Sequence, residues 1–207
     1  MKDIIFIGCG GHAKSIVDII EQNEEYKIVG FVDCNMDDNK MYRGYKIIGT
    51  DSQLKELYDK GIRYAAIGIG YLGTGELRDK VYSELKSNGF YIPSFVDHSA
   101  VLATDAQIGE GTIVGKMAIV NSAAIVGKMS IINSGAIIEH DCEIGDYTHI
   151  AVGARLCGDV KVGHHSFVGA GTTVIQGTKI GNECIIGANS TVLRDVPNLK
   201  KVYGIVK

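Results

Sequence analysis

Three ionisable residues follow one another in the C-terminal half of the chain, as Glu139-His140-Asp141. A histidine flanked by carboxylates can be held in one tautomer and can have its pKa raised, and both effects suit a general base near neutral pH. The alternative is a solvated polar surface, which is the usual environment of a single exposed histidine. Because the surrounding repeat carries little other charge, the three residues favour a general base.

The other histidines carry a weaker signal. His149 follows His140 by nine residues, His164 and His165 adjoin each other further on, and His98 lies about forty residues before His140. Three histidines at matched positions of adjoining subunits can bind zinc. The chain has no H-x-x-x-x-H spacing that would provide them, so we expect no metal site.

A glycine-rich motif, Gly8-Cys-Gly-Gly-His-Ala-Lys14, lies between a short buried-strand pattern and a helix that we expect to run to about Asn23. Backbone N–H groups at the start of a helix attract phosphate. Asp33 ends the next predicted strand, where dinucleotide-binding folds place an acid against ribose hydroxyls. Residue 13 is alanine rather than the third glycine of G-x-G-x-x-G, and the domain is short. A nucleotide or nucleotide-sugar therefore fits better than NAD.

A purely structural interpretation of this motif is also open. The glycines would then form only a tight turn, and His12 would cap the helix instead of contacting a phosphate.

The elements that must position these residues differ between the two halves of the chain. In the first half, strand patterns at Tyr26–Asp33 and Tyr64–Gly70 alternate with helix patterns at Asp51–Lys60 and Thr74–Ser87. Thr50 or Asp51 and Thr74 are suitable N-caps. Alternating strands and helices predict a parallel sheet covered by helices. We expect a Rossmann-like α/β domain over residues 1–92.

In the second half an aliphatic residue recurs every six positions, and a small residue stands two positions before it. The largest residue at these small positions is Val160. No α-helix or flat strand has a period of six, so the pattern predicts the stacked coils of a parallel β-helix. Only small side chains reach interior density near a corner of such a coil. The aliphatic positions are Leu102, Ile108, Val114, Val120, Val126, Ile132, Ile138, Ile144, Ile150, Leu156, Val162, Val168, Val174, Ile180, Ile186 and Val192.

Glycine follows every third aliphatic residue, at Gly109, Gly127, Gly145, Gly163 and Gly181. One corner therefore takes glycine in every turn, and three six-residue sides make a triangular prism. Glycine at that corner indicates either a positive φ or a crowded backbone. We assign residues 93–195 to this all-β domain and residues 196–207 to a C-terminal tail.

Composition and charge exclude several classes of protein. The 207 residues carry a net charge of −3 without a basic run, which argues against nucleic acid as the main partner. No apolar stretch has transmembrane length, and the N-terminal apolar run is too short for a signal peptide, so we expect no membrane partner and a cytoplasmic location. Cys142 and Cys184 occupy small inward positions, where we expect buried thiols rather than disulfides.

The whole chain resembles bacterial sugar acyltransferases that join an N-terminal nucleotide-sugar domain to a left-handed β-helix of hexapeptide repeats. These include nucleotide-4-amino-sugar N-acetyltransferases of the bacillosamine and perosamine pathways and the sialic acid O-acetyltransferase family. The most specific similarity is Ile138-Glu-His-Asp-Cys-Glu-Ile-Gly-Asp-Tyr-Thr-His-Ile-Ala-Val-Gly-Ala154, combined with the motif at residues 8–14. Left-handed winding, and a homotrimer with active sites between neighbouring subunits, are implied by this resemblance alone.

The resemblance also implies roles by position. His140 matches the catalytic base, and Asp141 matches the acidic residue beside it. Acetyl-CoA, the expected cosubstrate, would contact His149 near its thioester. The residues that match the path of the pantetheine arm are Gly158, Ala170 and Ala188, and those that match the nucleotide-sugar pocket are Gly10, Gly11, His12, Asp33 and Gly68.

These features predict an acetyl-CoA-dependent N-acetyltransferase acting on the amine of a UDP- or GDP-linked 4-amino-4,6-dideoxy-sugar, with direct transfer and no acyl-enzyme. One alternative keeps the coenzyme and changes the acceptor to a hydroxyl of a sialic acid. Another is a non-catalytic trimeric scaffold that senses a nucleotide-sugar, against which the residues Glu139-His140-Asp141 argue. The nucleotide-binding motif favours an acceptor that bears a nucleotide.

Overall fold

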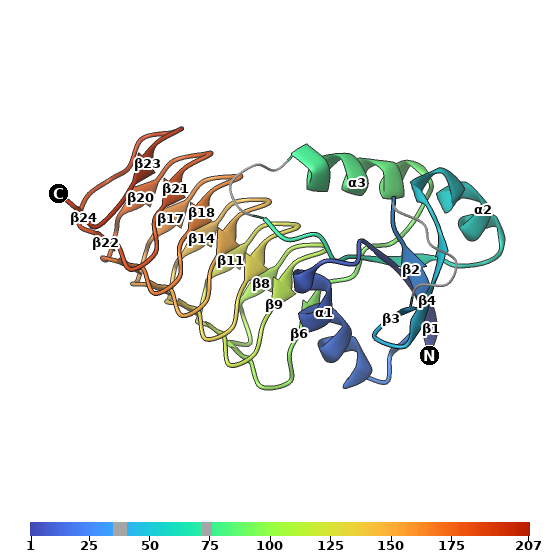
Figure 1. The fold of residues 1–207 in the computed structure, drawn as a ribbon. Helices are drawn as coiled ribbons and strands as arrows, with labels where there is room; N and C mark the ends of the chain where they lie inside the picture. Colours follow the sequence, from blue (N-terminus) through green and yellow to red (C-terminus); the bar gives the residue numbers. More distant parts are fainter. Residues whose placement is uncertain (35–40, 72–75) are drawn as a thin grey trace. The chain divides into compact units, whose positions relative to one another are not determined.

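The computed structural model describes residues 1–34, 41–71 and 76–207, and their contacts divide them into two units (Figure 1). The first unit consists of described residues within 1–70 and 76–93. The second consists of Tyr71 and residues 94–207. Each unit has its own core, and each is described by itself below.

The N-terminal unit is a five-stranded sheet in the order β3-β4-β2-β1-β5. The pairings among β1, β2, β4 and β5 are parallel, and β3 is antiparallel to β4, so the predicted Rossmann-like parallel sheet is confirmed with one antiparallel edge strand. Its elements are β1 (Lys2–Ile7), α1 (Gly11–Glu21), β2 (Tyr26–Val32), β3 (Met41–Tyr42), β4 (Tyr45–Gly49), a 3-10 turn η1 (Asp51–Gln53), α2 (Leu54–Asp59), β5 (Tyr64–Ile67) and α3 (Glu76–Ser87).

Local sequence explains where these elements begin. The strand β1 has a buried run from Ile4 to Ile7, as its apolar pattern predicts. Thr50 forms a capping box with Gln53 at the start of the η1–α2 segment. The helix expected from Thr74 is described from Glu76 onward, and Thr74 itself lies outside the described residues. The sequence patterns did not predict the short strands β3 and β4.

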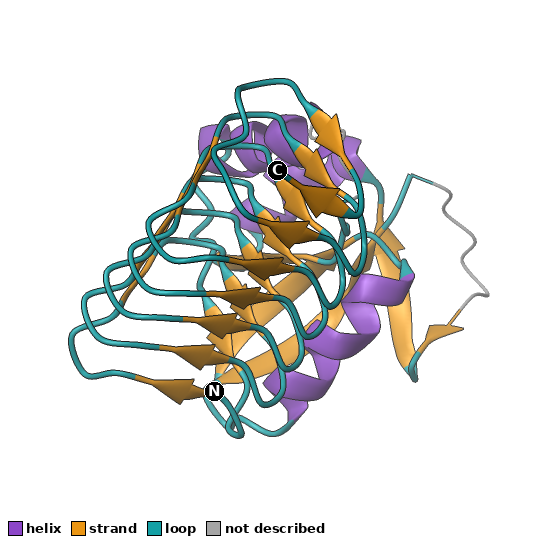
Figure 2. Cartoon of the chain, turned by 90° about the vertical axis from the view of Figure 1, so that its left-hand side faces the viewer, coloured by secondary structure: helices purple, strands orange, loops and turns teal. Residues whose placement is uncertain are grey.

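The second unit is a parallel β-helix whose strands stack into three sheets. The sheets have the orders β24-β22-β19-β16-β13-β10-β7, β20-β17-β14-β11-β8 and β23-β21-β18-β15-β12-β9-β6. Paired residues are eighteen apart, as in Ile119↔Ile137 and Glu143↔Lys161, which confirms three six-residue sides per turn. Figure 2 shows the coils as stacked triangular turns.

Each strand of the β-helix contains only two residues. In chain order they are β6 (Phe95–Val96), β7 (Val101–Leu102), β8 (Gln107–Ile108), β9 (Ile113–Val114), β10 (Ile119–Val120), β11 (Ile125–Val126), β12 (Ile131–Ile132), β13 (Ile137–Ile138), β14 (Glu143–Ile144), β15 (His149–Ile150), β16 (Arg155–Leu156), β17 (Lys161–Val162), β18 (Phe167–Val168), β19 (Thr173–Val174), β20 (Lys179–Ile180), β21 (Ile185–Ile186), β22 (Thr191–Val192), β23 (Lys201–Val202) and β24 (Ile205–Val206).

The aliphatic column and the small residues before it form one continuous core. Val120, Ile138 and Val174 have no exposed surface, and neither do the small residues Ala136 and Cys142. Because every coil fills the same narrow triangle, one aliphatic and one small side chain per side reach close packing. The inward pattern predicted from the repeat is confirmed.

The glycine column reflects backbone crowding, and a positive φ is not its cause. A Cβ on Gly145 would lie 2.6 Å from the backbone nitrogen of His164, and one on Gly109 would lie 2.5 Å from that of Lys128. Neither glycine is among the residues of positive φ. Residues of positive φ recur instead two positions after each residue that follows an aliphatic one, once in every six-residue side, and most of them are not glycine. These positions are Gly111, Met117, Ala123, Met129, Gly135, Asp141, Tyr147, Gly153, Asp159, His165, Gly171, Gly177, Glu183 and Asn189.

Residues 196–207, which the sequence pattern separates as a tail, continue the β-helix. Val202 pairs with Ile186, and Val206 pairs with Val192. Val196 is almost fully buried and forms a parallel bridge with Ile180. The six-residue period breaks after Val192, so the repeat itself does not extend to these residues, although their aliphatic side chains still close the core.

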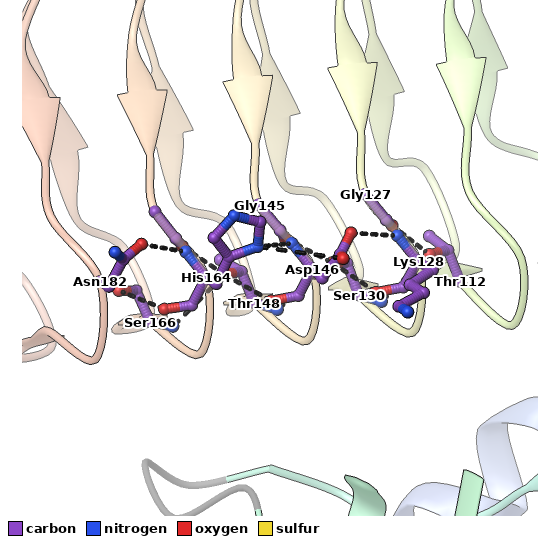
Figure 3. A network of polar contacts seen from close by, with 11 residues as sticks. Thr112, Gly127, Lys128, Ser130, Gly145, Asp146, Thr148, His164, Ser166 and Asn182 are labelled. Carbon is purple, nitrogen blue, oxygen red and sulfur yellow. Dashed lines mark hydrogen bonds and ion pairs between the residues drawn. The ribbon is translucent and has the colours of Figure 1, made fainter. Parts of the chain in front are cut away.

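A ladder of buried polar side chains runs inside the corner that carries the glycine column (Figure 3). Thr148 Oγ1 donates to the carbonyl of Gly163 at 2.7 Å and accepts the backbone N–H of Ser166 at 3.3 Å. One coil before, Ser130 Oγ donates to the carbonyl of Gly145, and one coil after, Ser166 Oγ donates to the carbonyl of Gly181. The ladder provides hydrogen-bond partners for backbone N–H and carbonyl groups at the corner, which lie outside the two-residue strands.

We expect Thr148→Val to destabilise the β-helix by about 1–3 kcal/mol, because the change preserves shape but leaves a buried carbonyl and a buried N–H without partners. Chemical unfolding of the purified protein measures the difference. Thr173→Val is the matched control, since Thr173 stands at the outward position of β19 and is half-buried. Equal free energies of unfolding for the two variants would contradict the importance of the ladder.

Candidate active site

The corner between β13 and β14 presents three ionisable side chains to the outside. Ile138 and Cys142 point into the core and are fully buried, so the residues between them face outward. Asp141 has a φ of 61°, in the left-handed region. Aspartate tolerates this conformation better than most residues. The inward positions of the repeat therefore place Glu139, His140 and Asp141 together on the outer surface of the coil.

His140 and Asp141 form a hydrogen-bonded pair. The distance from His140 Nδ1 to Asp141 Oδ2 is 2.8 Å, and both side chains are exposed. A carboxylate only accepts, so Nδ1 carries the proton and the lone pair of the neutral imidazole lies on Nε2. The hydrogen bond to Asp141 raises the pKa of His140, and the negative charges of Asp141, Glu139 and Asp159 add to the increase.

Gly158, one coil further on, leaves room for the imidazole ring. A Cβ built on Gly158 would lie 2.6 Å from Cε1 and 2.7 Å from Nε2 of His140. The backbone at Gly158 does not adopt a positive φ, so space for the ring is the reason for glycine. Sequence similarity points to a role for Gly158 in the coenzyme path, whereas the structure shows its contact with the candidate base.

Lys161, which no sequence pattern singles out, lies beside the pair. Lys161 Nζ donates to the backbone carbonyl of Asp141 at 3.1 Å and to Glu143 Oε1 at 2.6 Å. It also forms an ion pair of 3.3 Å with Asp159 Oδ1. The eighteen-residue turn was the signal that could have found it, since it pairs Lys161 with Glu143, two residues after Asp141.

Cys142 is the cysteine nearest in sequence to the pair, and it is held as a thiol. Its side chain is fully buried, and Sγ lies 3.2 Å from the carbonyl oxygen of Cys157. Burial raises the pKa of Cys142 to about 11. A thiol of this pKa is protonated near neutral pH and is a poor nucleophile.

His149 lies on a different sheet from the strands that flank His140. It begins β15, and its side chain is 93% buried, with 7% exposed. Nδ1 is 2.8 Å from the carbonyl oxygen of Tyr71, and Nε2 is 3.3 Å from the side-chain nitrogen of Asn133. The carbonyl only accepts, so Nδ1 carries the proton and Nε2 accepts from the Asn133 amide. The Tyr71 hydroxyl also donates to the carbonyl of His165.

Ala170 and Ala188 occupy equivalent positions of successive coils, at the corner between β18 and β19 and the corner between β21 and β22. Both are exposed. The structure thus groups these two residues with each other, and it groups Gly158 with His140 at a different corner.

In the N-terminal unit the five expected pocket residues gather at the carboxyl ends of β1, β2 and β5. One oxygen of Asp33 accepts the backbone N–H of Cys9 at 3.0 Å, so this carboxylate helps to hold the glycine turn. α1 begins with Gly10 as its N-cap residue, and no side chain caps it, so His12 does not serve as the cap. A Cβ on Gly11 would meet nothing within 4 Å.

Gly68 has a packing role in the same unit. A Cβ at Gly68 would lie 2.6 Å from the Cβ of Ala13 and 2.9 Å from the carbonyl oxygen of Gly8. The carboxyl ends of parallel strands next to a helix N-terminus are where nucleotides bind in such sheets. The open glycine turn is therefore the candidate binding position in this unit.

Two further properties concern only the part of the chain that the structure describes. No group of three or more histidine, cysteine, aspartate or glutamate side chains in it could hold a metal ion. Its helices are all too short or too polar to cross a membrane.

Two family models match the chain. Residues 3–85 match the PglD N-terminal domain, and residues 159–194 match the bacterial transferase hexapeptide family of six repeats. The two matches fall in the two units described above.

Known proteins are similar to this chain over most of its length. GDP-perosamine N-acetyltransferase of Escherichia coli O157:H7 is 26% identical over 153 residues, which are 71% of this chain and 66% of that protein. The crystal structure of PerB from Caulobacter crescentus with CoA and GDP-perosamine is 31% identical, with a TM-score of 0.90, and the match covers 99% of this chain and 95% of that one.

A second similar structure is the acetyltransferase domain of PglB from Neisseria gonorrhoeae in complex with acetyl coenzyme A. It is 26% identical, with a TM-score of 0.88, and the match covers 98% of this chain and 96% of that one. These similarities extend through both units, and they agree with a left-handed winding of the β-helix.

Proposed function

The chain belongs to the family of hexapeptide-repeat sugar acetyltransferases that carry a PglD-like N-terminal domain, and on this premise we propose that it transfers an acetyl group from acetyl-CoA to the amine of a nucleotide-linked amino-sugar. The observation that carries the proposal is the 2.8 Å hydrogen bond from His140 Nδ1 to Asp141 Oδ2. It leaves Nε2 of an exposed imidazole as a proton acceptor at an outward corner of the β-helix.

In the proposed reaction His140 acts as general base. The neutral sugar amine attacks the thioester carbonyl of acetyl-CoA, and Nε2 of His140 takes the proton that the amine loses. A C–N bond forms, the C–S bond breaks, and the proton passes to the departing thiolate. Asp141 orients the ring through Nδ1 and stabilises the imidazolium. The protonated Cys142 offers no nucleophile, which supports direct transfer without an acyl-enzyme.

The remaining expected residues enter the proposal as binding positions. Gly10, Gly11, His12, Asp33 and Gly68 would surround the nucleotide of the sugar substrate. Ala170, Ala188 and His149 would lie along the coenzyme in a homotrimer, with Gly158 also supporting His140. Contact of the coenzyme with Nε2 of His149 requires the Asn133 amide to turn away, because that amide occupies the nitrogen in this structure.

The test is release of CoA thiol from acetyl-CoA with three acceptors. UDP-linked and GDP-linked 4-amino-4,6-dideoxy-sugars are offered separately, and free sialic acid is the third. Release with one of the nucleotide amino-sugars is the expected result, and it names the nucleotide. Release only with sialic acid would assign the protein to O-acetylation, and no release from a folded, assembled protein would overturn the proposal.

The raised pKa of His140 predicts the pH dependence of turnover. The base must be neutral, so kcat/KM falls as the pH is lowered through a pKa that lies above the usual value for histidine. Asp141→Asn removes the negative charge but keeps a residue that tolerates the left-handed turn. We expect the acidic limb of kcat/KM to move to lower pH and the plateau to fall. Initial rates between pH 5 and 9 measure both.

Asp159→Asn provides a graded control for this prediction. Asp159 acts on His140 by charge without a hydrogen bond to the ring, and it shares the left-handed conformation. Its replacement should move the limb in the same direction and by less. A limb that does not move in Asp141→Asn would contradict the pairing of His140 with Asp141.

A further inference from the structure

The ammonium group of Lys161 contacts three oxygens around the candidate base. An ammonium group has three N–H donors. Its nitrogen lies within 3.3 Å of three oxygens, which belong to the backbone carbonyl of Asp141 and to the carboxylates of Glu143 and Asp159. The side chain is about two-thirds buried, with 32% exposed. Lys161 is therefore held in one place by its neighbours.

The contact with Asp141 holds the turn that carries the pair. The carbonyl of His140 accepts the backbone N–H of Asp159 at 2.9 Å, and the N–H of Asp141 donates to the carbonyl of Ser122 at 3.1 Å. Lys161 holds the remaining carbonyl, that of Asp141. A left-handed residue costs conformational energy, so bonds on both of its peptide groups help to keep it in place.

Lys161 also balances the charge around His140. The charged or titratable groups at this corner are Glu139, Asp141 and the buried thiol of Cys142 on the same turn, Glu143 on β14, and Asp159 and Lys161 on the next coil. Arg155 stands beside Ile137 on the strand before the corner, and Asp105 accepts a hydrogen bond from Ser122, whose carbonyl accepts the N–H of Asp141. Carboxylates predominate in this set. Without Lys161, the carboxylates of Glu143 and Asp159 would lose a cation that lies in direct contact.

We propose that Lys161 is a positioning residue of the acetyl-transfer site, which fixes the Asp141 turn and offsets the carboxylates around His140. This inference rests on the proposed role of His140 and Asp141. Lys161 touches neither substrate in the proposed reaction, so its effect passes through the pair. The ion pair with Glu143 keeps Lys161 protonated, because that contact raises the pKa of the lysine.

The first test is independent of activity. The pKa of the His140 imidazole is measured by NMR titration in the wild-type protein and in Lys161→Met, with His140→Asn to assign the signal. We expect the variant to raise the pKa of His140 by a few tenths of a unit, because a nearby positive charge disfavours the imidazolium. Lys179→Met is the matched control, since Lys179 pairs with Lys161 one coil further on and is exposed.

The second test uses turnover. In Lys161→Met the acidic limb of kcat/KM should move to higher pH, and kcat on the plateau should fall by about three- to ten-fold as the turn loosens. The KM values for both substrates should stay the same, and Lys161→Arg should restore much of the loss. Lys161→Gln, a second neutral variant, replaces Lys161→Met should the latter fail to fold.

The outcomes separate the two proposals. An unchanged pKa of His140 together with an unchanged kcat in a folded Lys161→Met protein, or equal changes in Lys179→Met, overturns the role of Lys161. Absence of CoA release by the wild-type protein overturns the proposed function, whereas the NMR titration still decides whether Lys161 controls the charge around His140.

Discussion

Replacing His140 with asparagine should lower kcat for CoA release by about 10²–10⁴-fold, the usual contribution of a general base. Asparagine cannot take the proton from the amine at neutral pH. The side chain of His140 is 62% exposed and belongs to no core, so the fold should be unaffected. Steady-state rates on the plateau of the pH profile measure the loss, and thermal unfolding checks that the variant remains folded.

His98→Asn is the matched control for this variant. His98 is also an exposed histidine beside an aspartate, with Nδ1 3.6 Å from Asp97 Oδ1. The same substitution there should leave turnover within about two-fold of wild type, since surface changes away from a site have small effects. Near-normal turnover in His140→Asn would remove His140 from the mechanism, and an equal loss in both variants would indicate a non-specific effect.

Gly158→Ala should produce the second large loss of activity, of about 10²-fold, without a comparable loss of stability. The added methyl group would overlap the imidazole of His140 at 2.6–2.7 Å. An exposed ring can turn away at little cost in unfolding free energy, but it then leaves the geometry in which Nε2 reaches the amine. Displacements of about 1 Å can cost this much in rate. Paired measurements of kcat and of unfolding free energy test the prediction.

Gly145→Ala should show the opposite behaviour. The atoms that a methyl group meets there are the backbone nitrogen of His164 at 2.6 Å and the carbonyl carbon of Gly163 at 2.7 Å. These atoms belong to the stacked coils and cannot move without disturbing them, so this variant should lose stability. A Gly158→Ala protein that is as unstable as Gly145→Ala would contradict the proposed reason for its glycine.

The double variant His140→Asn/Gly158→Ala tests whether Gly158 acts through His140. Once the base is absent, moving its ring has no further consequence, so the double variant should be no slower than His140→Asn alone. Losses that multiply would show that Gly158 has a separate role, such as contact with the coenzyme.

Local sequence was sufficient to predict much of the geometry of the candidate site. His140 and Asp141 adjoin in the chain, and the period of the repeat determines that both face outward, so their pairing follows from short-range geometry. The glycine turn at residues 8–14 was likewise predictable, because a strand, a turn and a helix are consecutive. The glycine column was predictable in position, but its cause was settled only by the backbone of the neighbouring coil.

The contacts that refine the site join residues far apart in the chain. Lys161 reaches back across twenty residues to Asp141, and Tyr71 lies seventy-eight residues before His149, whose ring it holds. Lys161 stands at an ordinary outward position of the repeat, and Tyr71 belongs to no sequence motif, so neither composition nor spacing singles them out. Side-chain direction and the satisfaction of each donor decide such contacts, and these depend on the folded backbone.

The sequence alone determined the stacked triangular coils, the buried aliphatic core and the display of Glu139, His140 and Asp141, because a strict six-residue period places every inward and outward side chain. The tertiary structure decided which oxygens Lys161 binds, why Gly158 must lack a side chain, and how residues 196–207 close the last coils after the period breaks. Periodicity specifies the face on which a residue stands, whereas contacts between coils depend on the positions of individual atoms, which are set only when the coils stack.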